Sequence, residues 1–306
     1  MTKTTPVPKS KTSSKIKATR DQRIFNCIAY PILTLVTIAC LIPFWMIVVT
    51  SFTDNSYIAV NGYQMFPTAW SMAAYQYLFK APDAILRAYG VTIMITVVGT
   101  AIGLTCITMT GYVLNRKDFP YRNHLSFYIY FTTLFSGGMV PSYILMVTVL
   151  DLQNNYWAVI LAGLMTPFLI ILMRNFMKSI PDALIEAATI DGANDFQIFT
   201  KIVIHLAGPG IATVCLFLAL GYWNNWYTPM LYLTKPRMYP LQYYLYNILT
   251  SAQSAQQSGV SLEGQQFPGE SIKMAMAVVA TGPILLLYPY IQKYFVKGIT
   301  IGAVKG

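Results

Sequence analysis

Charged residues are scarce in this sequence. Only 10% of its 306 residues are Asp, Glu, Lys or Arg, whereas 55% are hydrophobic, and the mean hydropathy is +0.50. A soluble domain carries roughly 25% charged residues, so this composition is hard to reconcile with a surface that faces water. The shortage argues against a soluble enzyme or nucleic-acid-binding domain, despite the net charge of +10. It indicates an integral membrane protein.

Residues that carry chemistry are also few. The chain has two His and 11 acidic residues, and no cluster has the spacing of a metal site. No phosphate-binding Gly-x-x-x-x-Gly-Lys-Ser/Thr loop is present. A membrane-embedded enzyme would therefore have little catalytic material, and we expect no catalytic residue, metal or cofactor in this chain. The four cysteines fall inside apolar runs, where packing is their ordinary role: Cys27, Cys40, Cys106 and Cys215.

Six long apolar runs contain no acidic residue, Lys or Arg. Each can cross a bilayer core about 30 Å thick as a helix of about 20 residues. Because lipid offers no partner to unpaired backbone groups, such runs predict helices rather than an open sheet. We therefore expect an all-α integral membrane fold with six transmembrane helices, within 24–52, 88–115, 125–150, 152–173, 202–234 and 274–292.

The basic residues gather in four segments, 1–23, 116–122, 174–201 and 293–305. By the positive-inside rule both termini are cytoplasmic, which agrees with six spans. The chain then divides into a disordered basic tail, a transmembrane domain and a cytoplasmic C-terminal tail too rich in Gly for a stable helix. Their bounds are 1–23, 24–294 and 295–306, with an external loop without regular structure at 235–273.

The segment 179–200 is a polar interruption between two apolar runs, and the charge pattern places it in the cytoplasm. Ser179-x-x-Asp182 resembles a capping box and predicts a helix start. Gly192 is placed to end that helix in a left-handed conformation, and Asn194 can cap a second helix. The residues leave two interpretations open: an amphipathic helix resting on the protein's own cytoplasmic face, or a docking site for a soluble partner.

Two stretches put polar or helix-breaking residues at membrane depth. Gly137, Gly138 and Pro141 interrupt the third run, either as the wall of a polar path or as a simple bend. The fifth run holds two amides among aromatic rings, a combination that suits sugar rings but also fits an interfacial aromatic belt. The candidate substrate path is Gly137, Gly138, Trp223, Asn224, Asn225 and Trp226.

Glu186-Ala187-Ala188-x-x-x-Gly192, followed after nine residues by Ile202, resembles the EAA loop of binding-protein-dependent ABC importer permeases. The surrounding IPDALIEAATIDGAN is similar to the carbohydrate-uptake branch, and FPTAWSMAAYQYLF to that branch's first external loop. The ending GITIGAVKG is similar to the maltose-type permease tail. The likeness covers almost the whole chain after the N-terminal tail. It is greatest for permeases for complex oligosaccharides and polysaccharide fragments in Gram-positive bacteria.

One position departs from the family pattern. The family usually continues Ile-x-Leu-Pro, whereas His205 stands here where the Pro is expected. The missing Pro puts a rigid kink at the start of the fifth span in doubt. His205 itself is either a pH-sensitive group or an interfacial polar residue with no special role.

The resemblance implies a type I ABC importer permease fold in which segment 179–200 carries a coupling helix that sits in a cleft of the ATPase. Glu186 is then expected to make a charged contact, Ala187 and Ala188 to pack closely, and Gly192 to form the turn. The C-terminal tail would reach the nucleotide-sensing region of the ATPase dimer. The residues implied in ATPase coupling are Glu186, Ala187, Ala188, Asp191, Gly192, Lys305 and Gly306.

The implied function is that of a permease subunit that moves oligosaccharides across the cytoplasmic membrane of a bacterium by alternating access. ATP and Mg would be bound by a separate ATPase dimer. The other implied partners are a second homologous permease, giving a heterodimer, and an extracytoplasmic solute-binding lipoprotein that loop 235–273 would reach; nucleic acid is not one of them. An ABC permease for a non-carbohydrate solute is one alternative. An ion-driven secondary transporter is another, although it usually needs charged groups within the bilayer and the six runs hold only His205.

Overall fold

The computed structural model describes residues 20–257 and 269–303. These residues form helices and connecting loops, with one isolated bridge between Thr53 and Trp70, which confirms the predicted all-α class. The helices are α1 (Arg20–Ser51), α2 (Asn55–Asn61), α3 (Ala73–Leu78), α4 (Pro82–Asn115), α5 (Arg122–Leu134), α6 (Met139–Ile144), η1 (Leu145–Val149), α7 (Tyr156–Leu164), α8 (Pro167–Met177), α9 (Asp182–Ile190), α10 (Asp195–Ile198), η2 (Phe199–Val203), α11 (Ile204–Leu206), α12 (Gly208–Trp223), α13 (Tyr227–Tyr232), η3 (Pro236–Met238), α14 (Leu241–Gln257) and α15 (Gly269–Ala303).

Three of these helices, α1, α4 and α15, are long and apolar enough to cross a membrane unbroken. Three further candidates are bent pairs: α5 with α6–η1 at 113°, α7 with α8 at 47°, and α10–α11 with α12 at 81°. Among the described residues, length and composition therefore allow three to six spans. The predicted apolar runs all lie over one of these helices or pairs.

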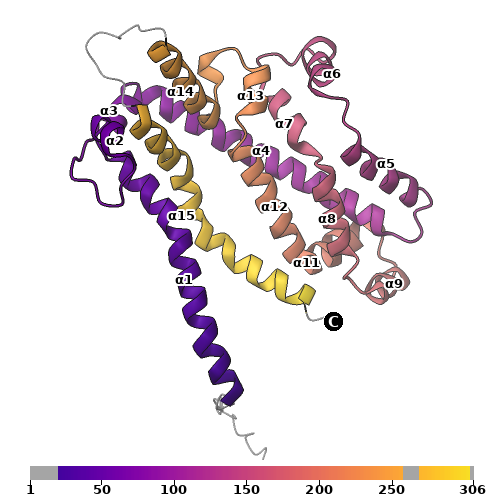
Figure 1. Cartoon of the computed structure of the whole chain (residues 1–306). Helices are drawn as coiled ribbons and strands as arrows, with labels where there is room; N and C mark the ends of the chain where they lie inside the picture. The colour runs from indigo at the N-terminus through magenta and orange to yellow at the C-terminus, as the bar shows by residue number, and fades with distance from the viewer. Residues whose placement is uncertain (1–19, 258–268, 304–306) are drawn as a thin grey trace, which may run out of the picture.

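Helix α4 runs through the middle of the molecule and packs against α7, α8 and α12 (Figure 1). Its glycines make that packing possible. A Cβ at Gly99 would lie 2.6 Å from the ring of Tyr222, and one at Gly111 would lie 2.8 Å from the side chain of Met173. The Tyr222 hydroxyl also donates a hydrogen bond of 2.8 Å to the carbonyl of Ile160. The glycines of α4 thus serve packing within this chain.

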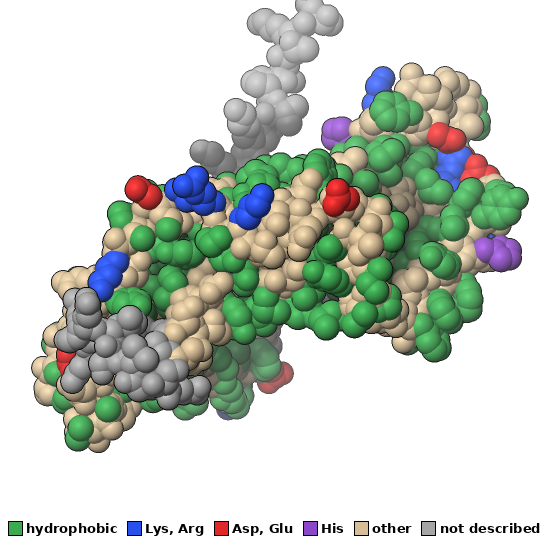
Figure 2. All heavy atoms as spheres, turned by 90° about the horizontal axis from the view of Figure 1, so that it is seen from above, with side chains coloured by type: hydrophobic (Ala, Val, Ile, Leu, Met, Phe, Trp, Pro, Cys, Tyr) green, Lys and Arg blue, Asp and Glu red, His purple; other side chains and the backbone are tan. Residues whose placement is uncertain are grey.

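The molecule has two ends, which we name after the helices found there. At the α9 end lie the start of α1, the short helices α9 and α11, and the end of α15; at the α14 end lie α2, α3 and α14 (Figure 1). Viewed from the α14 end, the surface shows scattered charged side chains among hydrophobic and uncharged atoms (Figure 2). Most large apolar side chains of α1 are exposed. Such a surface fits lipid or protein neighbours better than water.

The C-terminal segment differs from its prediction. Residues 295–303 continue α15 as a helix instead of forming a Gly-rich tail, and Lys305 and Gly306 lie outside the described residues. A glycine in a helix costs about 1 kcal/mol relative to alanine. A long helix that is already nucleated can carry that cost, because each further residue adds a hydrogen bond without a new nucleus.

The segment 235–273 is also more regular than predicted. It begins with η3 and then forms the 17-residue helix α14. The prediction took its many Gln and Ser residues as a sign of irregular structure, but Leu241 and Leu245 bury one face of α14 against α15. The residues between α14 and α15 lie outside the description. At the other end, α1 begins at Arg20, inside the segment predicted as a disordered tail.

A sharp bend is present before the fifth apolar helix even though His205 replaces the expected Pro. The chain turns by 81° between α11 and α12, and Pro209 lies in the first turn of α12. Proline has no N–H to donate there, so it marks the start of a new helix. The doubt about a kink was therefore wrong, because the Gly208-Pro209 pair takes over the role. His205 itself is exposed.

Candidate functional site

The segment 179–200 forms a helix–turn–helix that we call the candidate coupling loop. Helix α9 ends in a Schellman motif, in which Ala193 N–H donates to the carbonyl of Ala188 at 2.9 Å and Gly192 N–H to that of Thr189 at 3.1 Å. The φ angle of Gly192 is +82°, and nothing lies within 4 Å of where its Cβ would be. The predicted left-handed turn is confirmed, and it depends on backbone conformation, not on crowding.

Helix α10 begins with the predicted cap. The side chain of Asn194 accepts from the N–H of Gln197 at 2.9 Å, and Gln197 Oε1 accepts from the N–H of Asn194 at 3.0 Å. This reciprocal capping box satisfies two otherwise unpaired donors. The predicted cap of α9 was wrong: Ser179 donates to the carbonyl of Phe176, and α9 starts after Pro181 without a side-chain cap. Pro181 has a fixed φ angle just before the first turn of α9, so the backbone is already oriented for the helix without a capping hydroxyl.

The residues of the EAA motif separate into an exposed set and a buried one. Glu186, Ala187, Asp191 and Gly192 are exposed, whereas Ala188 is 9% exposed and lies in the main core cluster. Ala188 therefore packs against this chain's own interior, in contrast to the close external contact expected of it. The other four residues lie exposed at the tip of the loop: two of them carry a negative charge, one has a small side chain, and Gly192 forms the turn.

Two exposed apolar side chains belong to the same surface but were missed from the sequence. Ile190 is 86% exposed at the end of α9, and Phe196 is 68% exposed in α10. Large apolar side chains exposed this far suit contact with another molecule better than contact with water. Their signal in the sequence was a large apolar residue on each side of the Asp-Gly turn.

The short loop between α4 and α5 contacts both helices of the candidate coupling loop. Lys117 forms an ion pair with Asp182 at 2.6 Å, and Arg116 one with Asp195 at 3.0 Å. The hydrogen bond and positive charge of Arg116 hold the pKa of the Asp118 carboxyl below its usual value. The prediction recognised this loop only as short and basic. The acidic first residues of α9 and α10 were the available signal for its partners.

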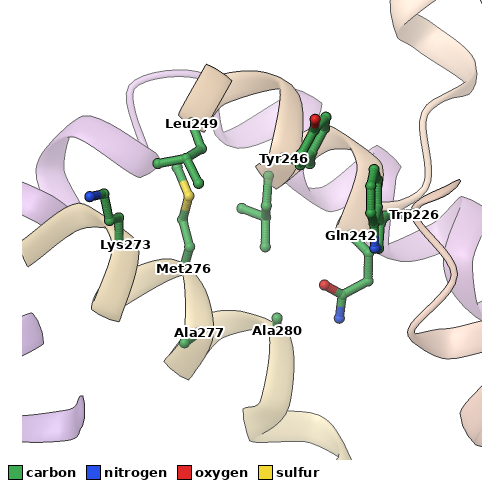
Figure 3. Close-up of a pocket in the computed structure, with 9 residues that line it drawn as sticks. Trp226, Gln242, Tyr246, Leu249, Lys273, Met276, Ala277 and Ala280 are labelled. Atoms are coloured by element: carbon green, nitrogen blue, oxygen red, sulfur yellow. The ribbon is translucent and has the colours of Figure 1, made fainter. Parts of the chain in front are cut away.

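A pocket lies at the α14 end, between α14 and α15 (Figure 3). Its volume is about 210 Å³. Trp226 stacks on Tyr246 with ring centroids 4.5 Å apart, and Gln242 donates to Asn224 Oδ1 at 3.4 Å. Lys273, at the opposite side in Figure 3, is paired with Glu270 at 2.7 Å. The lining residues are Trp226, Gln242, Leu245, Tyr246, Leu249, Lys273, Met276, Ala277 and Ala280.

The predicted path residues thus have different places. Trp226 lines the pocket and Asn224 supports its wall, but Trp223 is buried and donates through Nε1 to the carbonyl of Ala280 at 3.0 Å. Asn225 accepts from the N–H of Thr228 at 3.1 Å, near the start of α13. The pocket residues on α14 and α15 were not predicted from the sequence, because the segment that forms α14 was assigned to a loop.

The glycine break predicted in the third run is present. Gly138, with φ of +90°, lies just before α6, and it and Gly137 are exposed. A sharp change of direction between α5 and α6 follows from this backbone conformation. The two glycines are not among the residues that line the pocket.

Apolar helices, several of them bent, and a polar helix–turn–helix at one end define the class: a multi-pass membrane protein. The family model described as "binding-protein-dependent transport system inner membrane component" matches residues 103–301. The chain belongs to this family. It is a permease subunit of an ABC importer, not an enzyme, and resides in the cytoplasmic membrane. The ATPase of such an importer is a separate subunit, and a solute-binding protein is a further component.

Individual relatives support the same assignment. The chain is 40% identical over 285 residues to the polygalacturonan/rhamnogalacturonan transport system permease protein YtcP of Bacillus subtilis, covering 93% of this chain and 99% of the relative. It is 38% identical to protein LplC of Bacillus subtilis, covering 94% and 97%. An arabinooligosaccharides transport system permease protein, AraQ of Halalkalibacterium halodurans, is 29% identical, covering 86% and 91%.

A solved structure has the same fold. It is described as a bacterial ABC transporter involved in the import of the acidic polysaccharide alginate. One of its chains is 30% identical, with a TM-score of 0.75 over 91% of this chain and 99% of that chain. The likeness therefore extends over nearly the full length of both.

Proposed function

We propose that this chain is one half of a heterodimeric permease that imports oligosaccharides derived from complex polysaccharides. Alternating access would be driven by ATP and Mg bound to the partner ATPase. The observation that carries this proposal is the candidate coupling loop, whose Schellman turn and capping box hold an exposed tip at one end of a body of apolar helices. Such a rigid projection suits the transmission of movement from a soluble partner.

The tip of this loop offers two kinds of contact to an ATPase. Glu186 supplies a charge, and exposed Ile190 and Phe196 supply apolar surface. Ala187 leaves room for close approach because its side chain is small and exposed. Asp191 and Gly192 shape the turn between the two helices. Lys305 and Gly306, outside the described residues, are proposed to reach the ATPase from the C-terminus, which is supported by the end of α15 lying at the α9 end.

The α9 end is proposed to be cytoplasmic, with six spans and both termini on that side. The start of α1 and the end of α15 lie toward that end (Figure 1). Basic residues gather there too, as the positive-inside rule requires. Each bent helix pair would then cross the membrane once. Basic residues of the described loops and short helices include Arg116, Lys117, Arg122, Lys178 and Lys201.

A second permease is proposed to cover part of the exposed apolar surface. In α5 and α6 no residue is buried, and the exposed side chains include Phe127, Phe131 and Met139. A solute path for an oligosaccharide needs more wall than one such chain provides. The second half would supply it, and with it the missing contacts of α5 and α6.

The pocket at the α14 end is proposed to be the place where this chain contacts sugar on the external side. Stacked aromatic rings offer apolar faces to the C–H groups of a sugar, and the amides of Gln242 and Asn224 offer hydrogen bonds to its hydroxyls. The substrate class is supported by the relatives named for polygalacturonan/rhamnogalacturonan and for arabinooligosaccharides. Segment 235–273 is proposed to contact the solute-binding lipoprotein.

The test is reconstitution of the four-component importer in lipid nanodiscs, with ATP hydrolysis measured with and without the solute-binding protein and its oligosaccharide. Wild type is expected to be stimulated. Glu186→Arg should lose at least about tenfold of that stimulation, equivalent to about 1.4 kcal/mol, while the complex still assembles. Lys201→Glu, an exposed charge reversal beyond α10, is the control. Uptake into vesicles that persists without any ATPase subunit would refute the proposed function.

A further inference from the structure

The loop between α4 and α5 places two neighbouring basic residues against the candidate coupling loop. Lys117 Nζ lies 2.6 Å from Asp182 Oδ2, and Arg116 Nη1 lies 3.0 Å from Asp195 Oδ1. Asp182 is the first residue of α9 and Asp195 the first residue of α10. Carboxylates are favoured at helix N-termini, so both acids suit their helices as well as the basic loop. One loop thus holds both helices on either side of the Gly192 turn.

Arg116 is itself held in place. Its side chain is only 19% exposed. Its Nε donates to Asp118 Oδ1 at 2.8 Å and its Nη1 to the Tyr112 hydroxyl at 3.2 Å, while Nη2 forms an ion pair with Asp118 Oδ2. The planar guanidinium is therefore fixed on two sides, which is the arrangement in which Arg gives directional contacts. Because the guanidinium is held in one orientation, its ion pair with Asp195 also has a defined direction.

The base of the loop is anchored to α4 and α8. Arg116 caps the C-terminus of α4, and Asn115 donates through Nδ2 to the carbonyl of Met177, the last residue of α8, at 3.2 Å. The ring of Tyr112 packs against that of Phe199, just past α10, with centroids 5.3 Å apart. A displacement of α9 or α10 would therefore act on the end of α4.

Helix α4 extends from this loop to the α14 end. The Thr92 hydroxyl near its other end accepts the buried N–H of Leu241, the first residue of α14, at 2.7 Å. Between these points Gly99 and Gly111 keep α4 in close contact with Tyr222 and Met173. An unbroken helix of 34 residues thus connects the two ends of the molecule.

We propose that Arg116 and Lys117, with Asp182 and Asp195, form a loop bracket that couples the candidate coupling loop to α4. Arg116 and Lys117 are positioning residues: they fix α9 and α10 relative to α4, so that movement imposed at the ATPase reaches the transmembrane helices. This inference rests on the proposed function. It adds a second connection, separate in sequence from the EAA motif.

The two ion pairs are expected to contribute unequally. Lys117 and Asp182 are 75% and 49% exposed, and exposed pairs of this kind change an equilibrium by about fivefold at most. Arg116 is mostly buried, so its removal leaves Asp118 and Asp195 without their shared partner. Arg116→Gln should therefore reduce coupling more than Lys117→Gln. Glutamine is used in both variants because it removes the positive charge without introducing a negative one.

The decisive experiment is a charge swap in the complete importer in nanodiscs. Lys117→Asp and Asp182→Lys are made singly and together, and binding-protein-stimulated ATP hydrolysis is measured beside basal hydrolysis and the amount of ATPase retained. Each single variant should lower the stimulated rate about threefold to fivefold with assembly unchanged. The double variant should return to within about twofold of wild type, because the pair is restored with reversed sign. Arg122→Asp makes the same charge change at a residue that forms no ion pair within the described ranges.

Each outcome decides between two interpretations. Rescue by the double variant supports the loop bracket. A double variant as impaired as Lys117→Asp, with less ATPase retained, would instead mean that Lys117 contacts the ATPase directly, and it overturns the inference. Single variants with normal stimulation overturn it as well. Failure of the proposed function would appear differently, as a wild-type complex that retains no ATPase or shows no stimulation.

Discussion

The two ends of the molecule are built in different ways. At the α9 end, the turn and caps of the candidate coupling loop join residues no more than five positions apart, such as Ala193 with Ala188 and Asn194 with Gln197. At the α14 end, contacts join distant parts of the chain: Trp223 donates to Ala280, 57 positions away, and Tyr63 to Glu270, 207 positions away. The turn and caps of the candidate coupling loop are thus local, even though its ion pairs with Arg116 and Lys117 connect it to α4, whereas the α14 end exists only when the whole chain is folded.

Because of this difference, substitutions at the two ends should have different effects on coupling and on stability. A change in the turn or caps of the candidate coupling loop should alter coupling and leave the helical body intact, since those contacts join residues close in sequence. A change in a buried contact at the α14 end should lower the stability of the whole subunit. Each prediction below tests whether that division holds, from the largest expected effect to the smallest.

Trp223→Ala should destabilise the subunit as a whole. Trp223 is 8% exposed and hydrogen-bonded to α15, so the substitution removes a large buried side chain together with its hydrogen bond to the Ala280 carbonyl. Such replacements cost about 3–5 kcal/mol. Thermal unfolding of the detergent-solubilised complex, followed by size-exclusion chromatography, should show a lower melting temperature and less assembled protein. Trp226→Ala, at a residue 39% exposed, is the matched control, and equal losses in both variants would contradict a special structural role of Trp223.

Gly192→Val should reduce coupling while lowering the melting temperature much less than Trp223→Ala does. The residue needs φ of +82°, and a residue with a Cβ pays roughly 1–2 kcal/mol there, most for a β-branched side chain. Stimulated ATP hydrolysis should fall by about tenfold, which corresponds to about 1.4 kcal/mol. Gly192→Asn, which tolerates the left-handed region, should retain most activity. Equal impairment of the Asn and Val variants would mean that the glycine is needed for space at the partner surface instead.

Trp226→Ala should weaken substrate use and nothing else. If the pocket holds a sugar, loss of the Trp226 ring removes one stacking surface while Tyr246 remains. The KM for oligosaccharide uptake should rise by about threefold to tenfold, in line with about 1 kcal/mol for one aromatic contact. Trp226→Phe should recover most of the difference. An unchanged KM with both variants would remove the pocket from the solute path.

Asn194→Ala should loosen α10 alone. Loss of an N-cap side chain costs about 1 kcal/mol, so amide hydrogen exchange in residues 196–199 should accelerate by about fivefold. Asn194→Asp keeps an acceptor at the same position and should restore protection. Faster exchange in α12 or α15 as well would show that the α9 end is less self-contained than its hydrogen bonds indicate.

The same division explains what could be predicted from the sequence. Gly192 and Asn194 act through neighbours a few positions away, so the turn and second cap of the candidate coupling loop were readable directly. Apolar runs gave the helices because length and missing charge are enough in a bilayer. The pocket was not readable, since it needs α14 folded against α15, and Gln and Ser residues on the outer face of α14 hid Leu241 and Leu245 on its inner face. Ala188 was assigned outward because a motif gives spacing but not which side of the helix is buried.

The smallest effect concerns pH, which should leave the loop bracket unchanged over the physiological range. Arg116 lowers the pKa of Asp118 from its ordinary 3.8, so the stability this carboxylate contributes is fully present above that value and is lost only as pH falls through the lower folded-state pKa. The bond to Asp182 raises the pKa of Lys117 from its ordinary 10.5, so its contribution is present below that value and is lost only as pH rises through the higher folded-state pKa. The ratio of stimulated rates between wild type and Lys117→Asp should therefore stay constant from about pH 5.5 to about pH 8.5. A ratio that changed more than about twofold across that interval would show that another titrating group controls the contact.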